Sequence, residues 1–275
     1  MASLSLNHHN LLLLLFLLFS CDLHSTTANR PQVFDHSDWI SEESTALDKW
    51  ELKQPPQDPQ LNCESWRFGV ETNTVRFWSV VPQECVEYVK DYMDGSQYLL
   101  DSNVVANVSI AYANSLNLSG DGKDVWVFDV DETLLSNLPL YAAYNYGGAD
   151  MDDGAFIKWA DLAEAPALPA SQRLYAHLLQ LGFKIFLLTG RYDYERNATE
   201  KNLVQAGYHS WEALLLRGPD DYETTAVVYK SGRRLKIEKD GFRIRGNSGD
   251  QWSDLSGYSC GDRTFKLPNP MYFIA

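Results

Sequence analysis

The chain has 275 residues, of which 45% are hydrophobic and 22% are charged, and its formal net charge at pH 7 is −14. A chain of this length and composition can bury one large core, with or without a small appendage. The negative charge argues against nucleic acids and anionic membrane surfaces as partners, because both would repel the protein.

Residues 1–28 are predicted to be a signal peptide. They contain the apolar run LLLLLFLLFS, which is too short to span a bilayer comfortably, and they end in the small residues Thr26-Thr27-Ala28. No Lys or Arg precedes the run, so the alternative is an anchor that stays uncleaved. No later segment is long and apolar enough to cross a membrane, so cleavage leaves a chain without membrane contact that enters the secretory pathway.

Removal of the signal peptide takes away Cys21 and leaves Cys63, Cys85 and Cys260. Cys63 and Cys85 are close in sequence and are the best candidates for a disulfide, which would contribute about 3 kcal/mol to stability. Cys260 is then the odd cysteine, and a free thiol, an intermolecular bridge and a different pairing all stay open. The cysteines have no Cys-x-x-Cys spacing that would indicate zinc.

Residues 29–120 are expected to form an extended and helical N-terminal region. The part up to about residue 60 is polar, and its proline-rich stretch KQPPQDP excludes a helix or a central strand. Apolar residues then recur at helical spacing in residues 84–98 and 102–116, which predicts a helix in each.

From Lys123 onward, short apolar runs alternate with longer segments of helical spacing at residues 171–181 and 194–206. This alternation is typical of a parallel sheet with helices on both faces. We therefore predict an α/β core over residues 121–275, in which residues 134–180 form a small helical cap. The runs that predict strands are VWVF (125–128), KIFLLT (184–189), ALLLR (213–217) and FRIRGN (242–247).

Two aspartates, Asp129 and Asp131, follow the first of these runs in the sequence VWVFDVDETLLSN. Ligands bind at the carboxyl ends of strands in an open parallel sheet, so both carboxylates are candidate site residues. The simpler alternative is an acidic turn that caps the next helix. A calcium loop of the EF-hand type is excluded, because Leu134 and Leu140 stand where it needs glycine and glutamate.

Later segments supply what a phosphate site needs. Thr189 and Gly190 offer a hydroxyl and free backbone N–H groups at the end of the second run. Lys230 offers a mobile positive charge just before the start of a basic helix. Asp250 and Asp254 follow the fourth run. Taken alone, each has a simpler explanation, such as a capping hydroxyl or a surface lysine.

In this order, FDVDET, LLTGR, YK and GDQWSD resemble the four motifs of the haloacid dehalogenase superfamily, whose core is a Rossmann-like parallel sheet. The stretches NCESWRFGVE and VPQEC and the segment RTFKLPNPMYFIA extend the resemblance to the plant acid phosphatase and vegetative storage protein family, over nearly all of the mature chain. Members of this family pair, so the resemblance allows a homodimer. It leaves the cell wall and the vacuole open as the destination of the mature chain.

The resemblance implies a role for each carboxylate. Asp129 attacks phosphorus and forms an aspartyl-phosphate, while Asp131 protonates the leaving oxygen and later activates water. The implied cofactor is Mg²⁺, held by Asp129, the backbone carbonyl of Asp131 and Asp250, with waters completing an octahedron. Asp254 either orients a metal-bound water or pairs with Lys230.

The resemblance also implies that Thr189, Gly190 and Lys230 bind the substrate phosphate. At about 4 Å and an effective dielectric constant of 20, each pair of carboxylate and phosphate charges repels by roughly 4 kcal/mol, so compensating cations are required. We further expect the acidic surroundings of Asp131 to raise its pKa, and hence an acidic working pH. The alternatives to Lys230 are Lys201, Arg233 and Arg234.

We therefore expect an Mg²⁺-dependent acid phosphatase that hydrolyses small phosphomonoesters. The alternative is a vegetative storage protein with weak or vestigial activity. Because the chain keeps Asp129, which some storage members of the family lack, its residues favour the enzyme. Phosphoryl transfer to an alcohol would share the same intermediate. The sequons at Asn107, Asn117 and Asn197 fit a secreted or vacuolar glycoprotein.

Overall fold

A computed structural model describes residues 62–275, except for the side chain of Asp153. These residues belong to one compact unit of the chain, Asp58–Ala275. The predicted signal peptide of residues 1–28 and the extended segment of residues 29–60 lie outside the described residues. Within the described range, no helix has the length and hydropathy that a membrane span requires.

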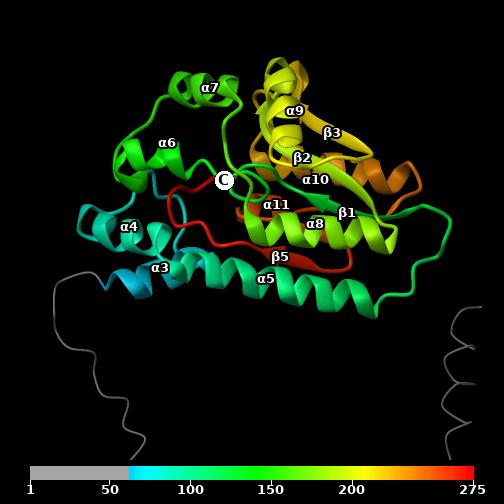
Figure 1. The fold of residues 1–275 in the computed structure, drawn as a ribbon. Helices are drawn as coiled ribbons and strands as arrows, with labels where there is room; N and C mark the ends of the chain where they lie inside the picture. Colours follow the sequence, from blue (N-terminus) through cyan, green and yellow to red (C-terminus); the bar gives the residue numbers. More distant parts are fainter. Residues whose placement is uncertain (1–61) are drawn as a thin grey trace, which may run out of the picture. The chain divides into compact units, whose positions relative to one another are not determined.

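The core is a parallel sheet of five strands in the order β3-β2-β1-β4-β5 (Figure 1). The runs that predicted the first four strands are confirmed. The fifth was not predicted, because three residues are too few to show a pattern. β1 lies at the centre, so its carboxyl end is flanked by those of β2 and β4. The strands are β1 (Asp124–Phe128), β2 (Lys184–Tyr192), β3 (Ala213–Arg217), β4 (Arg243–Gly249) and β5 (Thr264–Lys266).

Helices precede the sheet and cover it. α8 and α9 confirm the helices expected at residues 171–181 and 194–206. The boundary expected between residues 98 and 102 lies instead at Gly95. A Cβ at Gly95 would lie 2.5 Å from the carbonyl oxygen of Asp91, so this tight junction between α4 and α5 requires glycine. The helices are α3 (Cys63–Glu71), α4 (Val86–Asp94), α5 (Ser96–Ser115), α6 (Leu138–Ala143), α7 (Asp153–Leu162), α8 (Pro169–Leu181), α9 (Arg196–Gln205), α10 (Ala226–Lys239) and α11 (Trp252–Leu255).

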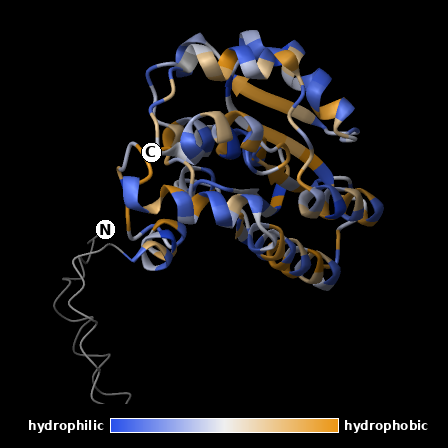
Figure 2. Cartoon of the chain, turned by 60° about the vertical axis from the view of Figure 1, so that its left-hand side comes forward, coloured by the Kyte–Doolittle hydropathy of each residue, from blue (hydrophilic) through white to orange (hydrophobic). Residues whose placement is uncertain are grey.

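Alternate side chains of β1 pack into two different hydrophobic clusters, one on each face of the sheet. Trp126 and Phe128 pack with residues of α5 and α8 on one face of the sheet. Val125 and Val127 pack on the other face with residues of α10. The prediction of helices on both faces is therefore confirmed, and the apolar strands between them stand out in orange in Figure 2. A strand that is buried on both faces is rigid, which fixes the position of the residues that follow it.

Between β1 and β2, in the segment expected to form a cap, α6 and α7 lie beyond the strand ends (Figure 1). α8 falls in the same segment of sequence, residues 134–180, but packs along α5 beside the sheet. Residues of α6 and α7 are therefore the ones placed over the carboxyl end of β1.

The N-terminal helices form a separate core with the segment that follows β5. The predicted disulfide between Cys63 and Cys85 is confirmed and joins α3 to the turn before α4. Cys260 forms no disulfide with another cysteine of the described chain. Trp66 of α3 and Met271 belong to the same hydrophobic cluster, although they are far apart in sequence. This packing attaches the segment after β5 to the first helices of the described chain.

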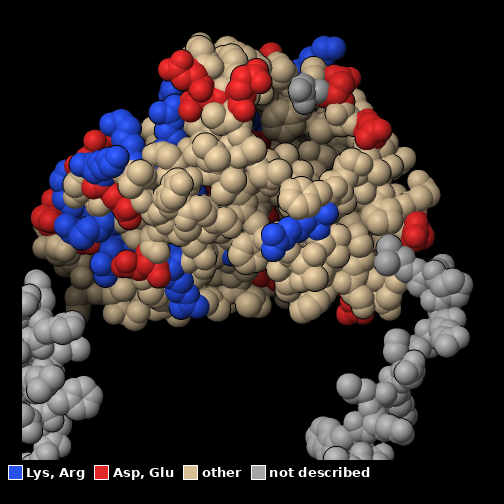
Figure 3. All heavy atoms as spheres, turned by 180° about the vertical axis from the view of Figure 1, so that it is seen from behind, with Lys and Arg blue, Asp and Glu red and all other residues tan. Residues whose placement is uncertain are grey.

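Charged side chains are unevenly spread over the surface. On the face drawn in Figure 3, most Lys and Arg side chains gather toward one side, with acidic side chains among them, and the middle of the face carries few charges. The net charge of −14 belongs to the whole chain and is not spread evenly over this face.

Asp124, at the start of β1, is a buried carboxylate, and its side chain is 5% exposed. It accepts hydrogen bonds from Arg243 Nε at 3.0 Å and from the backbone N–H of Ser119 at 2.7 Å. The hydrogen bond from Arg243 lowers the pKa of Asp124, even though burial acts in the opposite direction. This ion pair links the first residue of β1 to the first residue of β4.

We predict that Asp124→Asn lowers the free energy of unfolding by about 1–3 kcal/mol at pH 7. Because the pKa of Asp124 is lowered by folding, the stabilisation is present above the unfolded pKa of about 3.9 and is lost as the pH falls through the folded pKa. Urea unfolding at pH 7 and at about pH 3 should show a smaller deficit at the lower pH. Equal deficits at the two pH values would contradict the prediction.

Candidate active site

The structure brings most of the predicted site residues into one pocket of about 470 Å³. Thr189 is the exception, because it is fully buried behind the wall and donates to Asp131 Oδ2 at 3.4 Å. The strand β2 continues past Thr189 to Tyr192, so this residue lies within the strand and not at its end. The predicted site residues that line the pocket are Asp129, Asp131, Gly190, Lys230, Asp250 and Asp254.

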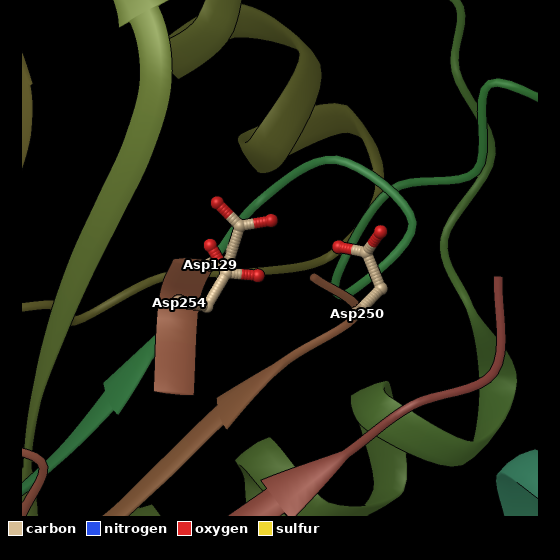
Figure 4. A group of neighbouring side chains, drawn as sticks. All are labelled: Asp129, Asp250 and Asp254. Carbon is tan, nitrogen blue, oxygen red and sulfur yellow. The ribbon is translucent and has the colours of Figure 1, made fainter. Parts of the chain in front are cut away.

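Three of these carboxylates face one another (Figure 4). Asp129 follows β1, Asp250 follows β4 and Asp254 lies on α11, and one oxygen from each falls within 4.8 Å of the others. All three are buried. Burial, followed by the charge of Asp254, raises the pKa of Asp129 well above its usual value and that of Asp250 to about 6. Crowded carboxylate oxygens of this kind fit a hard divalent cation.

Lys230 supplies a positive charge to this cluster. Its Nζ donates to Asp129 Oδ1 at 2.5 Å and also to Asp254 Oδ1. Burial alone would lower the pKa of Lys230, but the charges of the two carboxylates outweigh it and the pKa is raised. The sequence left two roles open for Asp254, orienting a metal-bound water or pairing with Lys230. The structure shows the pairing with Lys230.

Lys230 lies inside α10, so its expected position ahead of the helix is wrong. Helix α10 begins at Ala226, and Lys230 comes one turn later on the face that is turned toward the strand ends. Two features concealed this start in the sequence: the apolar residues before Lys230 resemble a strand, and Gly232 interrupts the helical pattern.

The carboxylate of Asp131 is held by Arg191. Nε of Arg191 lies 3.2 and 3.1 Å from the two carboxylate oxygens, and Nη2 lies 2.7 Å from Oδ1. Burial alone would raise the pKa of Asp131, but the charge and hydrogen bonds of Arg191 outweigh it and the pKa is lowered. The expected rise of this pKa is therefore wrong, because the nearest charged group is a guanidinium and not another acid. Arg191 stands in the stretch LLTGR but was not predicted as a site residue.

Asn137 connects Asp131 to the cap. Its Nδ2 donates to Asp131 Oδ1 at 2.9 Å and to Glu132 Oε2 at 3.1 Å. Its Oδ1 accepts from Trp159 Nε1 of α7 at 2.8 Å. Burial and the charge of Asp250 raise the pKa of Glu132 to about 8. These contacts fix the direction of the Asp131 carboxylate. Of the residues that make them, only Asp131 was predicted from the sequence as a site residue.

The segment after β5 holds Asp250. Asn269 Nδ2 and Gln251 Nε2 each donate to Asp250 Oδ2 at 2.8 Å. The backbone N–H of Asn269 and Lys266 Nζ in turn donate to the carboxylate of Glu71, at the end of α3. α3, the first helix of the described chain, thereby supports Asp250, although Glu71 and Asn269 are 198 residues apart in sequence.

Two buried polar atoms of the pocket have no hydrogen-bond partner in the part of the chain that the structure describes. They are Ser253 Oγ and Glu195 Oε1. A buried hydroxyl without a partner is rare in folded proteins and is available to a ligand. Ser253 precedes Asp254 on α11 and lines the same pocket as the carboxylate cluster.

We predict that Arg191→Met lowers the free energy of unfolding by about 3–5 kcal/mol, because it leaves Asp131 buried without its counter-charge. Adding Asp131→Asn should restore part of the loss, since an amide needs no counter-charge. Urea unfolding of the three variants measures both effects.

Arg196→Met is the matched control, because the ion pair of Arg196 with Asp193 is exposed, with side-chain exposures of 39% and 58%. It should cost less than about 1 kcal/mol. Equal losses for the two arginines would contradict the assignment of Arg191 as the buried partner.

The chain is similar to known proteins over most of its length. A family model described as HAD superfamily, subfamily IIIB (acid phosphatase), matches residues 49–275. The chain is 54% identical over 215 residues to "Acid phosphatase 1" of Solanum lycopersicum, covering 78% of this chain and 84% of that protein. It is 44% identical over 218 residues to "Stem 28 kDa glycoprotein" of Glycine max, with coverages of 78% and 85%.

It is also 42% identical over 215 residues to "Vegetative storage protein 2" of Arabidopsis thaliana, covering 78% of this chain and 80% of that protein. Among solved structures, the class C acid phosphatase from Bacillus anthracis superimposes with a TM-score of 0.58 at 22% identity, covering 68% of this chain and 84% of that one. The structural likeness shows the fold, and the sequence matches show the family. The chain therefore belongs to subfamily IIIB of the HAD superfamily, the acid phosphatase family.

Proposed function

We propose that the protein is an Mg²⁺-dependent acid phosphatase that hydrolyses small phosphomonoesters through a phosphoryl group carried by Asp129. One observation carries the proposal: the Asp129 carboxylate lines the pocket with Lys230 Nζ at 2.5 Å and with two further carboxylates beside it. A nucleophile, a positive charge and a set of cation ligands are thus present at one point.

The two aspartates of the turn after β1 perform complementary steps. A carboxylate oxygen of Asp129 attacks phosphorus, the bond to the leaving oxygen breaks, and that oxygen takes a proton from Asp131. Water then attacks phosphorus and gives a proton to Asp131, and the bond between Asp129 and phosphorus breaks to release phosphate. The contacts from Arg191 and Asn137 aim the Asp131 carboxyl for both proton transfers.

The phosphoryl oxygens require donors and positive charge. Lys230, Gly190 and Ser253 line the pocket, and we assign their ammonium, backbone N–H and hydroxyl groups to these oxygens. Ser253 Oγ has no partner among the described residues, so it can donate without breaking a protein hydrogen bond. Thr189, behind the wall, accepts from the backbone N–H of Arg191 at 3.1 Å and positions this part of β2.

The carboxylate cluster fits a hard cation such as Mg²⁺, because it holds three buried acids and its one lysine pairs with only two of them, Asp129 and Asp254. Asp129, Asp250 and the backbone carbonyl of Asp131 would hold the ion, and Asp254, already paired with Lys230, would complete its surroundings. When bound, Mg²⁺ supplies positive charge that offsets the repulsion between these carboxylates and the phosphate.

The size of the pocket supports small substrates. Its volume of about 470 Å³ is in the range of sites for small molecules. Met151, Phe156 and Ile157, from the segment that includes α7, line it with apolar surface. A leaving group of modest size would lie against these side chains.

Storage is the second candidate function, because a relative at 42% identity is named a vegetative storage protein. Accumulation as a store requires neither a nucleophile nor a positive charge beside it. The pair formed by Asp129 and Lys230 therefore favours the enzyme over a purely storage role.

We also propose that the protein enters the secretory pathway, to reach the cell wall or the vacuole. The disulfide between Cys63 and Cys85 supports this proposal, because such bonds persist in oxidising compartments. The asparagines of the three sequons are exposed and accessible to glycosylation: Asn107, Asn117 and Asn197.

We predict that Asp129→Asn reduces the hydrolysis of phenyl phosphate by at least about a thousandfold, since an amide does not act as the nucleophile. Release of phosphate in the presence of Mg²⁺ measures the effect. Asp240→Asn, which alters an exposed pair with Lys236, is the control and should retain turnover. Equal and negligible rates in the unchanged protein and in Asp129→Asn would favour storage.

We predict that Mg²⁺ at about 100 times its Kd stabilises the fold by roughly 2.7 kcal/mol, which raises Tm by about 5 °C or more. Asp250→Asn should remove most of this shift, because it takes a ligand from the cluster. Asp262→Asn, an exposed partner of Arg245, should keep it. Thermal unfolding with Mg²⁺ and with EDTA measures the shift, and a full shift in Asp250→Asn would contradict the assigned ligand set.

A further inference from the structure

The pocket extends beyond the aspartates to the carboxyl end of β3. Its wall there includes Arg217, the last residue of β3, together with Tyr222 and Thr224. Tyr192, the last residue of β2, is the register partner of Arg217, and its ring centre lies 5.0 Å from that of Tyr222. We call these four residues the distal subsite. A substrate whose phosphate lies at Asp129 presents its leaving group to the remaining wall of this pocket.

Arg217 is the cation of the distal subsite and is only 9% exposed. Its Nη1 donates to the backbone carbonyls of Asp221 and Thr224, each at 2.9 Å. Its Cζ lies 4.7 Å from the ring centre of Tyr229. Across residues 62–275, no carboxylate lies within 4.0 Å of its guanidinium, and Nε and Nη2 have no hydrogen-bond partner. The edge of the guanidinium that carries two parallel donors is therefore unoccupied by protein.

Other arginines around the pocket are matched by protein groups. Arg191 is paired with Asp131, and Arg233 is paired with Asp221. Arg234 has no carboxylate partner in the described chain, but its donors bind backbone carbonyls of residues 254–259, and it does not line the pocket. Arg217 differs because it combines burial, an unused pair of donors and a position on the pocket wall.

The pocket is lined by many carboxylates, so the unused donors of Arg217 affect which substrate charges it can accept. A second negative charge on a leaving group would be repelled by the carboxylates, unless a cation met it directly. Lys230 and Arg191 also line the pocket, but both are engaged with aspartates. Without a role for Arg217, the pocket should therefore disfavour anionic leaving groups. The carboxylates that line it are Asp129, Asp131, Asp152, Glu195, Asp250 and Asp254.

We propose that Arg217 binds a second anionic group, a carboxylate or a second phosphoryl group, that is carried by the leaving group of the substrate. The two parallel donors of a guanidinium edge match the paired oxygens of either anion. Because Arg217 is buried and has no counter-ion among residues 62–275, an anion there gains more than it would at an exposed lysine. The preferred substrates are thus phosphomonoesters of acids, and not of neutral alcohols. This inference rests on the proposed phosphatase function.

Arg217 also has a structural role, because its Nη1 holds residues 221–224 against the end of β3. Loss of that contact would lower activity toward every substrate. The test must therefore compare substrates of one shape that differ in charge, because only an anion site discriminates between them.

The probes are 4-carboxyphenyl phosphate, 4-phosphonophenyl phosphate and the neutral 4-carbamoylphenyl phosphate. For each protein, kcat/KM for a charged probe is divided by kcat/KM for the neutral probe. We expect Arg217→Gln to lower this ratio by about tenfold or more, mainly through KM, and Arg217→Lys to retain part of it. The intrinsic reactivities of the probes cancel when the ratios of two proteins are compared.

Arg263→Gln is the matched control, because Arg263 also lies over an aromatic ring, 5.3 Å from the centre of Tyr112, but does not line the pocket. Its ratio should stay within about twofold of the unchanged protein. A loss confined to the carboxyl probe, or to the phosphono probe, supports the proposal and identifies the anion. A ratio that Arg217→Gln leaves unchanged overturns it. Absence of turnover with all the probes refutes the phosphatase function instead.

Discussion

The contact on which the rest of the site depends is the Lys230 ammonium between Asp129 and Asp254. Parallel strands deliver several carboxylates to one buried edge of the sheet, and such a cluster is unfavourable without positive charge. Lys230 reaches it from α10, whose placement is fixed by apolar packing on Val125 and Val127 of the central strand. The hydrophobic core of one sheet face thereby determines where the ammonium lies. The stability of that layer and the chemistry of the site are consequently coupled.

A second ion pair, between Arg191 and Asp131, divides the acids into two groups with different tasks. Asp129, Asp250 and Asp254 form a cluster that suits a metal ion, and Lys230 pairs with the first and the last of them. The carboxylate of Asp131 is instead held by a guanidinium and an amide. Two aspartates that are one residue apart in sequence therefore have opposite pKa shifts. A divalent cation bound at Asp129 would favour the ionised form that a nucleophile needs, whereas the lowered pKa of Asp131 opposes its role as a proton donor.

The sequence was sufficient to predict the parts of the molecule that follow local rules. Strong apolar runs marked four strands. Asp129 was found because it directly follows the first run, and Asp250 because it comes shortly after the fourth. Arg191 and Asp131 are 60 residues apart, and Glu71 and Asn269 are 198 apart, so no periodic pattern records either contact. The pKa of Asp131 was mispredicted for the same reason, because its sign depends on which distant group packs closest. The start of α10 was obscured by β-branched residues that are equally typical of strands.

The segment after β5 has a consequence for the way the protein is made. Asn269 holds Asp250, and Tyr272 donates to Glu132 beside the central turn. During translation the sheet can begin to form before these residues leave the ribosome, but the acidic centre lacks its supports until they do. A nascent or prematurely terminated polypeptide would consequently remain catalytically silent, whatever the state of its earlier strands.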